Sequence, residues 1–404
     1  MSGRVLLPGN PGNPGARGAG EGVTLGVMGG GQLGRMFVHA AQTMGYFTAV
    51  LDPDPVSPAG LVSHHHVQTD YLDAQGLAQL AQCCDAVTTE FENVPAPALA
   101  TLAASVVTSP AAAAVRIAQD RIAEKAHLAC SGVPVAPYAV IETPEQLAAV
   151  ADSLLPGILK TARLGYDGKG QVRVRTRAEL AGAWESLQRV ACVLEQMLPL
   201  AAECSVIVAR GHDGTCVNFP PQLNLHRNGI LAVTEVYEGN MPLSQVESAV
   251  DATKKIADEL NYVGVLCVEF FVLTEGSPER AELGALVVNE MAPRPHNSGH
   301  YTLDACDASQ FDLQVRTLAG LPLAQPRLHS AAVMLNLLGD LWVNGATPCW
   351  DQVQALPGVH LHLYGKLQAK SGRKMGHLTV TAATAPQARA TALQAAALLG
   401  IEPF

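Results

Sequence analysis

The chain has 404 residues, of which 48% are hydrophobic and 15% are charged, with a formal net charge of −10 at pH 7. This length allows about three domains, and the acidic balance argues against general binding to nucleic acid or to an anionic membrane. Nine scattered cysteines without a Cys-x-x-Cys pair predict reduced thiols in a cytoplasmic protein, and no apolar run is long enough for a transmembrane helix.

Residues 1–22 are rich in glycine and proline and lack the apolar stretch of a signal peptide, so we expect a disordered leader outside the fold. A strand over 23–28, a Gly-x-Gly-x-x-Gly loop over 29–34 and a helix to Met44 follow. The next strand, 47–51, ends at Asp52. This pattern is typical of a dinucleotide site with an acid for the ribose, although a helix N-terminus binds any phosphate.

The βα alternation continues through a helix at 73–82, a strand at 86–91, a helix at 97–104 and a strand at 106–108, which predicts a small open α/β sheet. Glu92 follows a strand directly, where it can bind a sugar or simply cap the next helix. His64, His65 and His66 are adjacent and therefore diverge on any regular element, so no metal site is predicted there.

The most distinctive stretch is a loop with three glycines between two strands. The apolar run 157–159 predicts a strand ending at Lys160, Gly165–Gln171 forms the loop, and 172–175 alternates like a second strand. Such a loop can fold over a polyphosphate, because glycine lets backbone amides approach closely. The alternative is an ordinary hairpin with a solvated tip.

Beyond the loop we expect a helix at 178–188 and a strand at 192–198 with a polar break, which can offer its backbone to a purine edge. Glu203 is placed to take ribose hydroxyls. Before the loop, a helix is expected at 145–153, and Asp120–Lys125 is expected on a helix leaving the first unit. Further strands are expected at 204–209, 217–219 and 230–236, followed by a helix at 245–260.

Two apolar strands each carry an acid near one end. Glu269 lies in 265–272, and Asn289 and Glu290 lie in 286–291, with a hairpin loop over 273–284 between the strands. Carboxylates on neighbouring strands can converge on Mg²⁺, and burying an unpaired carboxylate would be costly. The sequence therefore predicts a magnesium site here, followed at once by a polar segment containing Arg294 and His296.

The last third predicts strands at 331–338, 359–364 and 378–381 and a final helix at 386–399. Four basic residues gather between the last two strands: Lys366, Lys370, Arg373 and Lys374. In an acidic chain this cluster is either a local anion site or a solvated turn.

As a set, these motifs resemble the ATP-grasp enzymes, and most closely the N5-carboxyaminoimidazole ribonucleotide synthetases of purine biosynthesis. The resemblance covers about residues 23 to 400 and keeps order and spacing. The matching stretches are Gly31–Met36, Glu90–Val94, Asp120–Lys125, Gly165–Gln171, Asn224–Ile230, Asn289–His300 and Gly372–His377.

The resemblance implies an α/β and α+β fold in three parts: a Rossmann-like preATP-grasp domain over 23–122, a two-lobed ATP-grasp domain over 123–325, and a small C-terminal domain over 326–404. It implies an ATP-dependent ligase, cytoplasmic and homodimeric, that uses ATP and Mg²⁺, with Mn²⁺ as an alternative. The reaction would carboxylate 5-aminoimidazole ribonucleotide with bicarbonate through carboxyphosphate, releasing ADP and phosphate.

The resemblance also assigns the site residues. Those expected to hold ATP are Arg121, Lys160, Gly165, Gly168, Gly170, Gln171, Glu195, Gln196, Met197, Leu198, Glu203, His226, Asn289 and Glu290. Glu269 and Glu290 would hold the metal. Tyr166, Asp167 and Lys169 would act on bicarbonate or carboxyphosphate, with Asp167 or the leaving phosphate as the base. Those expected to surround the ribonucleotide are Gln32, Leu33, Glu92, Arg294, His296, Lys366 and Arg373, with the Gly29–Gly34 loop holding its phosphate instead of NAD.

Three rival readings exist: a formate-dependent phosphoribosylglycinamide transformylase of the same architecture, an NAD-dependent oxidoreductase, and a catalytically inactive ATP-grasp binding protein. Gln32, Tyr166 and Asp167 favour carboxylation over formate transfer. The oxidoreductase leaves the lysine and the acid pair unexplained. The ligase reading requires that Lys160, Glu269 and Glu290 surround one triphosphate.

Overall fold

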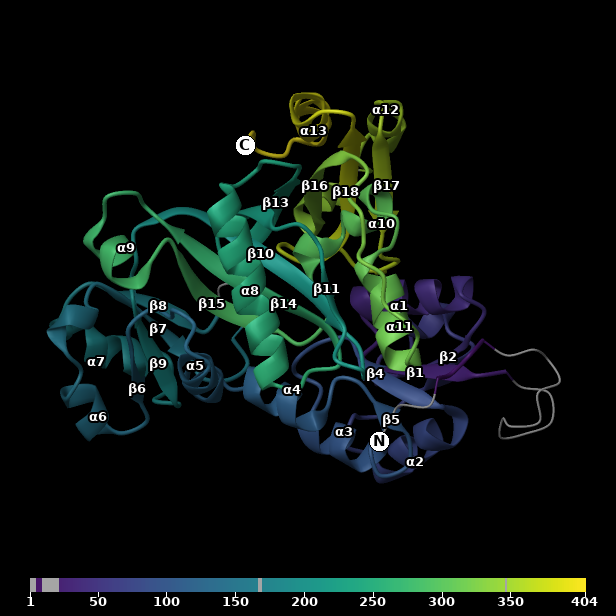
Figure 1. Cartoon of the computed structure of the whole chain (residues 1–404), viewed down its shortest axis with the longest axis horizontal. Helices are drawn as coiled ribbons and strands as arrows, with labels where there is room; N and C mark the ends of the chain where they lie inside the picture. The colour runs from purple at the N-terminus through teal and green to yellow at the C-terminus, as the bar shows by residue number, and fades with distance from the viewer. Residues whose placement is uncertain (1–4, 9–21, 166–168, 346) are drawn as a thin grey trace.

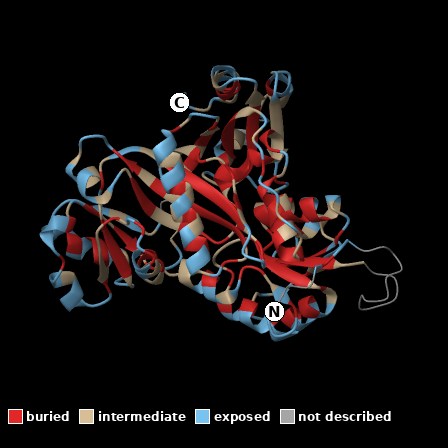
Figure 2. Cartoon of the chain, in the orientation of Figure 1, coloured by how far each residue is buried: buried red, intermediate tan, exposed pale blue. Residues whose placement is uncertain are grey.

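The computed structural model describes residues 5–8, 22–165, 169–345 and 347–404. Figure 1 shows a first unit at the lower right, a small lobe at the left and a large central body that extends upward to the C-terminus. Buried residues are concentrated in the strands and on the inner faces of the helices (Figure 2). Among the described residues, no helix is long and apolar enough to cross a bilayer.

The first unit is a five-stranded parallel sheet with the order β3-β2-β1-β4-β5. Its strands are β1 Thr24–Met28, β2 Phe47–Leu51, β3 His65–Val67, β4 Ala86–Thr89 and β5 Val107–Thr108, and its helices are α1 Gln32–Thr43, η1 Gly60–Val62, α2 Ala74–Cys83, α3 Ala96–Leu102 and α4 Ala112–Ala118. Every residue of β1 is buried, as expected for a central parallel strand covered on both faces. The open α/β sheet is as predicted, but the short strand β3 was missed.

The small lobe contains a four-stranded antiparallel sheet with the order β6-β9-β7-β8. Its strands are β6 Tyr138–Ile141, β7 Gly157–Thr161, β8 Gln171–Val174 and β9 Cys192–Gln196, and its helices are α5 Arg121–Cys130, α6 Pro144–Ala148, η2 Asp152–Leu154 and α7 Arg177–Ser186. The helix predicted over 145–153 is wrong in extent. It divides into α6 and η2, because Val150 turns inward to the core cluster that contains Leu154 and Trp184.

The large body is built on a nine-stranded sheet with the order β15-β14-β10-β12-β13-β16-β18-β17 and with β11 beside β10. Its strands are β10 Leu200–Arg210, β11 Cys216–Asn218, β12 Gln222–Arg227, β13 Ile230–Val236, β14 Gly264–Leu273, β15 Leu286–Ala292, β16 Ala331–Leu338, β17 Val359–Leu363 and β18 Lys374–Ala382. Its helices are α8 Leu243–Glu259, α9 Pro278–Leu283, η3 Asn297–Gly299, α10 Thr302–Ala305, α11 Gln310–Ala319, η4 Gly339–Gly345, α12 Trp350–Gln354 and α13 Ala385–Leu399.

The hairpin loop and the last strand of this body differ from the prediction, and the C-terminal strands join the central sheet. The hairpin loop expected over 273–284 contains helix α9, which Ser277 caps by accepting from the Arg280 amide. Strand β18 begins at Lys374, four residues early, because its basic start pairs with β16. The C-terminal strands also continue the central sheet through the antiparallel pairing of β13 with β16, so this part does not have a sheet of its own.

The first unit and the large body share a hydrophobic core. Helix α11, which was not predicted, packs against α1 and contributes Phe311 and Val315 to the cluster that contains Phe37. Leu6 belongs to the same cluster: its amide donates to the Ala319 carbonyl at 2.8 Å, and its carbonyl accepts from the Tyr46 hydroxyl at 2.7 Å. The expectation of a leader outside the fold is therefore wrong for residues 5–8, while residues 9–21 lie outside the described residues.

Candidate active site

One cavity of about 880 Å³ is lined by side chains from the first unit, the small lobe and the central sheet. Sixteen of the predicted site residues line it: Gln32, Leu33, Glu92, Arg121, Lys160, Gly165, Lys169, Gly170, Gln171, Glu203, His226, Glu269, Asn289, Glu290, Arg294 and His296. The lysine and the two acids on which the ligase reading depends therefore share one cavity. Tyr166, Asp167 and Gly168 lie outside the described residues.

Glu195 does not line this cavity, but its carboxylate contacts three positively charged side chains. Its side chain is only 3% exposed, and its carboxylate lies 3.0 Å from Lys160 Nζ, 3.3 Å from Lys125 Nζ and 3.8 Å from Arg121 Nη1. Burial favours the neutral acid, but Lys125, Lys160 and Arg121 outweigh it and lower the pKa of Glu195 to about 2. Glu195 is thus an ionised partner of the cations, not a residue that lines the cavity as predicted.

The acid pair predicted for the metal occupies facing positions on neighbouring strands, because β14 and β15 pair Glu269 with Glu290. Arg121 Nη2 lies 3.1 Å from Glu290, and His296 Nε2 lies 2.9 Å from Glu269. Burial alone would raise the pKa of Glu269, but His296 lowers it well below the usual range, so the carboxylate is ionised at neutral pH.

Asn289 adds a further oxygen beside this pair. Its side-chain Oδ1 is buried and has no hydrogen-bond partner among the described residues. Two carboxylates and an amide oxygen are ligands that Mg²⁺ prefers, so the donor set fits a hard divalent cation.

Glu203 and His226 form a second polar pair in the cavity. They lie on the paired strands β10 and β12, with His226 Nδ1 3.0 Å from Glu203 Oε2. Burial would lower the pKa of His226, but the close contact with Glu203 and the nearby carboxylates outweigh burial and raise it. The apolar side chains of Leu200 and Phe271 also line the cavity, so a ligand there can contact both polar and apolar groups.

The glycine loop at the start of α1 does not offer its amides to a ligand. Gly31 and Gly34 donate to the two carboxylate oxygens of Glu90 at 2.6 and 2.7 Å, and Gly30 donates to Asp52 Oδ2 at 2.7 Å. A Cβ on Gly31 would lie only 2.4 Å from Glu90 Oε1. The chain's own acids thus occupy the position that a phosphate would take at Gly30, Gly31 and Gly34, so these three amides support neither the predicted phosphate role of the loop nor NAD binding.

Gln32 and Leu33, at the tip of the same loop, do line the cavity, opposite an ion pair of Glu92 with Arg294. Both partners are largely buried. Burial would raise the pKa of Glu92, but the Arg294 guanidinium lowers it, so the pair is ionised.

The basic turn before β18 contributes Lys374 to the cavity, whereas Lys366 and Arg373 do not line it as predicted. Lys366 Nζ donates to the Lys374 carbonyl at 2.7 Å, and Arg373 Nη1 donates to the Gln368 carbonyl at 2.8 Å. Those two cations hold the turn, and the strand that begins at Lys374 directs that side chain inward. The run of basic residues in the sequence indicated an anion site, but it did not show which of these residues faces the cavity.

The last residues of the strand predicted over 192–198, namely Gln196, Met197 and Leu198, do not line the cavity either. The amides of Gln196 and Met197 donate to the carbonyls of Pro137 and Pro156, both at 2.9 Å, and Leu198 is buried in another core cluster. These two amides are therefore not available to a purine edge in this structure.

Thirteen lining residues were not among the predicted site residues, although several of them carried a local signal in the sequence. They are Glu90, Phe91, Asn93, Ile158, Thr161, Arg173, Leu200, Asn228, Gly229, Leu231, Phe271, Asn297 and Lys374. Ile158 and Phe271 follow from strand alternation, since each is two residues from a predicted site residue on the same strand. Glu90, Phe91 and Asn93 lie within the motif around Glu92.

Three family profiles match the chain in order. They are the ribonucleotide synthetase preATP-grasp domain over residues 23–119, the ATP-grasp domain over 126–311, and the phosphoribosylaminoimidazole carboxylase C-terminal domain over 332–391. The fold and the cavity, with its lysine and paired acids, thus define an ATP-grasp ligase.

Similar proteins indicate one family among the ATP-grasp ligases. The N5-carboxyaminoimidazole ribonucleotide synthases of Brucella melitensis and Bacillus subtilis are 41% and 40% identical to this chain, covering 89% of it and 96% and 91% of their own lengths. A crystal structure of an N5-carboxyaminoimidazole ribonucleotide synthetase with ADP superposes with a TM-score of 0.86 at 38% identity, covering 97% of both chains.

The Aspergillus clavatus enzyme, solved with ADP and 5-aminoimidazole ribonucleotide, superposes with a TM-score of 0.83 at 32% identity, covering 94% of this chain and 98% of its own. The chain belongs to the N5-carboxyaminoimidazole ribonucleotide synthase family.

Proposed function

We propose that this chain carboxylates 5-aminoimidazole ribonucleotide with bicarbonate and ATP, giving N5-carboxyaminoimidazole ribonucleotide, ADP and phosphate in purine biosynthesis. The observation that carries the proposal is that one cavity is lined both by Lys160, Glu269 and Glu290 and by Gln32, Glu92 and Arg294. The first set is suited to bind the phosphates of ATP, and the second forms a polar subsite for the ribonucleotide. A reaction between ATP and a ribonucleotide needs the two substrates side by side.

On the nucleotide side, Lys160 and Arg121 supply the positive charge that a transferring phosphoryl group requires. Glu195 fixes the position of both cations before the nucleotide arrives, since it contacts both from behind. Glu269, Glu290 and Asn289 would hold Mg²⁺, or Mn²⁺ in its place, which would supply charge neutralisation at the phosphates. Glu203 and His226 are proposed to bind the nucleoside part, next to Leu200 and Phe271.

On the ribonucleotide side, we assign Gln32, Leu33, Glu92, Arg294 and His296 to the substrate. Lys374 is proposed as the cation for its phosphate, with Lys366 and Arg373 holding the turn from which Lys374 projects. Because Glu92 and Arg294 neutralise each other, they present fixed hydrogen-bonding groups without a large net charge.

Bicarbonate is a poor electrophile, so its oxygen first attacks the γ-phosphoryl group to give carboxyphosphate, and the ribonucleotide amine then attacks the activated carbon. Lys169 lines the cavity and is proposed to bind this anion. Tyr166 and Asp167 are proposed to complete that subsite, with Asp167 or the leaving phosphate accepting the amine proton. Carboxyphosphate hydrolyses readily, so water must be excluded from it. We propose that the Gly165–Gln171 loop closes over the site for this purpose.

We further propose that the chain is a cytoplasmic homodimer with domains over 23–122, 123–325 and 326–404. The profile matches end near these boundaries.

The test is coupled ADP release by the purified chain with Mg²⁺. Release should require both 5-aminoimidazole ribonucleotide and bicarbonate, and formate or NAD should change nothing. Release driven by formate and phosphoribosylglycinamide would instead support the transformylase. Asp167→Asn should abolish carboxylation, and near-normal turnover of that variant would leave the phosphate as the base.

A further inference from the structure

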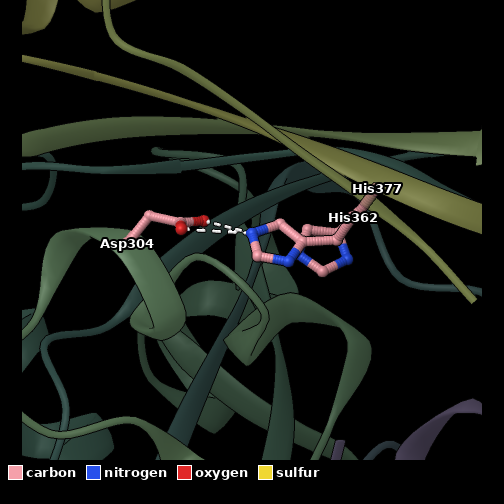
Figure 3. Close-up of side chains that lie close together, drawn as sticks. All are labelled: Asp304, His362 and His377. Atoms are coloured by element: carbon pink, nitrogen blue, oxygen red, sulfur yellow. Dashed lines mark hydrogen bonds and ion pairs between the residues drawn. The ribbon is translucent and has the colours of Figure 1, made fainter.

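A cluster of histidines lies where the C-terminal hairpin meets helix α10, and none of its members lines the catalytic cavity. Strands β17 and β18 place His362 directly opposite His377, and the two imidazole rings are parallel, with centroids 4.5 Å apart. His362 Nε2 lies 2.9 Å from Asp304 Oδ2. Figure 3 shows this contact and the His377 ring beside that of His362. One ligand atom from each of these three residues lies within 4.8 Å of the others.

The buried member of the cluster has an unused nitrogen. His377 is fully buried, and its Nε2 has no hydrogen-bond partner among the described residues. An unpaired buried polar atom costs free energy, so a native chain normally supplies it with a partner. The other ring nitrogen, Nδ1, is 3.0 Å from the Tyr364 hydroxyl. When Nδ1 carries the proton and donates it to this oxygen, Nε2 keeps a lone pair that can bind a ligand.

We propose that Asp304, His362 and His377 form a binding site for a transition-metal cation, specifically Zn²⁺, separate from the catalytic cavity. Two imidazoles and a carboxylate match the ligand preference of Zn²⁺, which often takes three protein ligands and a water. Bonds of about 2.0–2.1 Å at tetrahedral angles set neighbouring ligand atoms about 3.4 Å apart. His362 Nε2 and Asp304 Oδ2, which are 2.9 Å apart, would therefore separate by about 0.5 Å. The partly exposed His362 ring would also rotate out of its parallel stack on His377, because a metal lies in the plane of each imidazole that binds it.

The cluster reaches solvent, so a metal ion can enter it from outside. The Asp304 side chain is 10% exposed and that of His362 is 33% exposed, so the cluster is open to solvent on their side. His360, two residues from His362 on the same strand face, lies 3.7 Å from Asp304 and is available as a further ligand.

A metal at this position would connect two parts of the catalytic cavity. Asp304 follows the segment that carries Arg294 and His296, while His377 follows Lys374 on β18. The link continues inside the protein, because Gln310 contacts both the His296 backbone and His300 Nδ1, and the His300 ring lies 4.7 Å from His377. Bound Zn²⁺ would thus hold the two substrate-side segments together.

The experiment is a Zn²⁺ titration of the chelator-stripped full chain against a chromophoric chelator, in excess Mg²⁺ and ADP so that the catalytic metal position is filled. Wild type should bind about one Zn²⁺ per chain. Asp304→Asn and His362→Gln should bind it at least about 10-fold more weakly, and Tyr364→Phe about 10- to 100-fold more weakly. Two controls, His329→Gln at an exposed histidine and Glu269→Gln in the catalytic cavity, should keep the wild-type affinity.

Two results would overturn the proposal: no Zn²⁺ bound by wild type in excess Mg²⁺, or wild-type affinity in both Asp304→Asn and His362→Gln. Loss of binding in Glu269→Gln would assign the ion to the catalytic cavity and reject the site as well. If His362→Gln does not fold, Asp304→Asn decides alone, since it keeps every imidazole. Bound Co²⁺ gives a second readout, because its visible absorption changes when a histidine or carboxylate ligand is lost.

Discussion

Replacing Glu195 by glutamine tests how the cations of the catalytic cavity are held. The side chain keeps its size but loses its charge, which leaves Lys160, Lys125 and Arg121 close together without a shared counter-ion. Because the site is buried, water cannot solvate the three positive groups fully. We therefore expect Glu195→Gln to lower the free energy of unfolding substantially.

The magnitude follows from the pKa of Glu195, which falls from 4.5 to about 2 in the fold. At about 1.4 kcal/mol for each tenfold change in the acid dissociation constant, this difference is on the order of 3 kcal/mol. This agrees with the roughly 3–5 kcal/mol measured when one partner of a buried ion pair is removed. Since the folded pKa lies below the unfolded one, this stability is fully present above pH 4.5 and is lost as the pH falls toward 2.

The assay is urea unfolding of both proteins at pH 7 and at acidic pH, with and without ADP. Wild type should be about 3 kcal/mol more stable at pH 7, and the difference should shrink on acidification. ADP should stabilise the variant more than wild type, because phosphates replace the missing negative charge. Glu185→Gln is the control, since Glu185 pairs with Arg189 on the surface and its loss should not be measurable. A difference below about 0.5 kcal/mol for Glu195→Gln would refute the reasoning.

Three further substitutions test other parts of the structure. Gly31→Ala would place a Cβ 2.4 Å from Glu90 Oε1 and displace the loop that carries Gln32, so KM for the ribonucleotide should rise about 10-fold while ADP affinity is kept. Gly182→Ala, with open space around it, is the control, and equal KM values in the two variants would contradict the prediction. Lys374→Met should raise the KM for the ribonucleotide about 10- to 100-fold, and Lys370→Met on the same turn should leave it unchanged. Steady-state kinetics that show the reverse order would assign the ribonucleotide phosphate to Lys370. Leu6→Ala should lower the free energy of urea unfolding by about 2 kcal/mol, whereas Leu7→Ala, 64% exposed, should change it by less than about 0.5 kcal/mol; equal effects would mean that Leu6 is not part of the core.

The amino-acid sequence alone determined the elements with strong periodicity and the order of the motifs. The acid-bearing strands, the lysine at the end of β7 and the parallel sheet of the first unit follow from local patterns, because alternation and apolar runs report burial directly. Motif order and spacing then indicated the family. These features predicted that Lys160, Glu269 and Glu290 would share one cavity, which the structure confirms.

The tertiary structure decided which partner each polar group meets. Glu90 fills the glycine loop from 56 residues away, Glu195 turns toward three cations, and Lys374 reaches the cavity in place of Arg373. The pairing of His362 with Asp304 likewise joins residues 58 positions apart. Side-chain direction depends on strand register and on the paths of distant segments, and a local pattern carries neither.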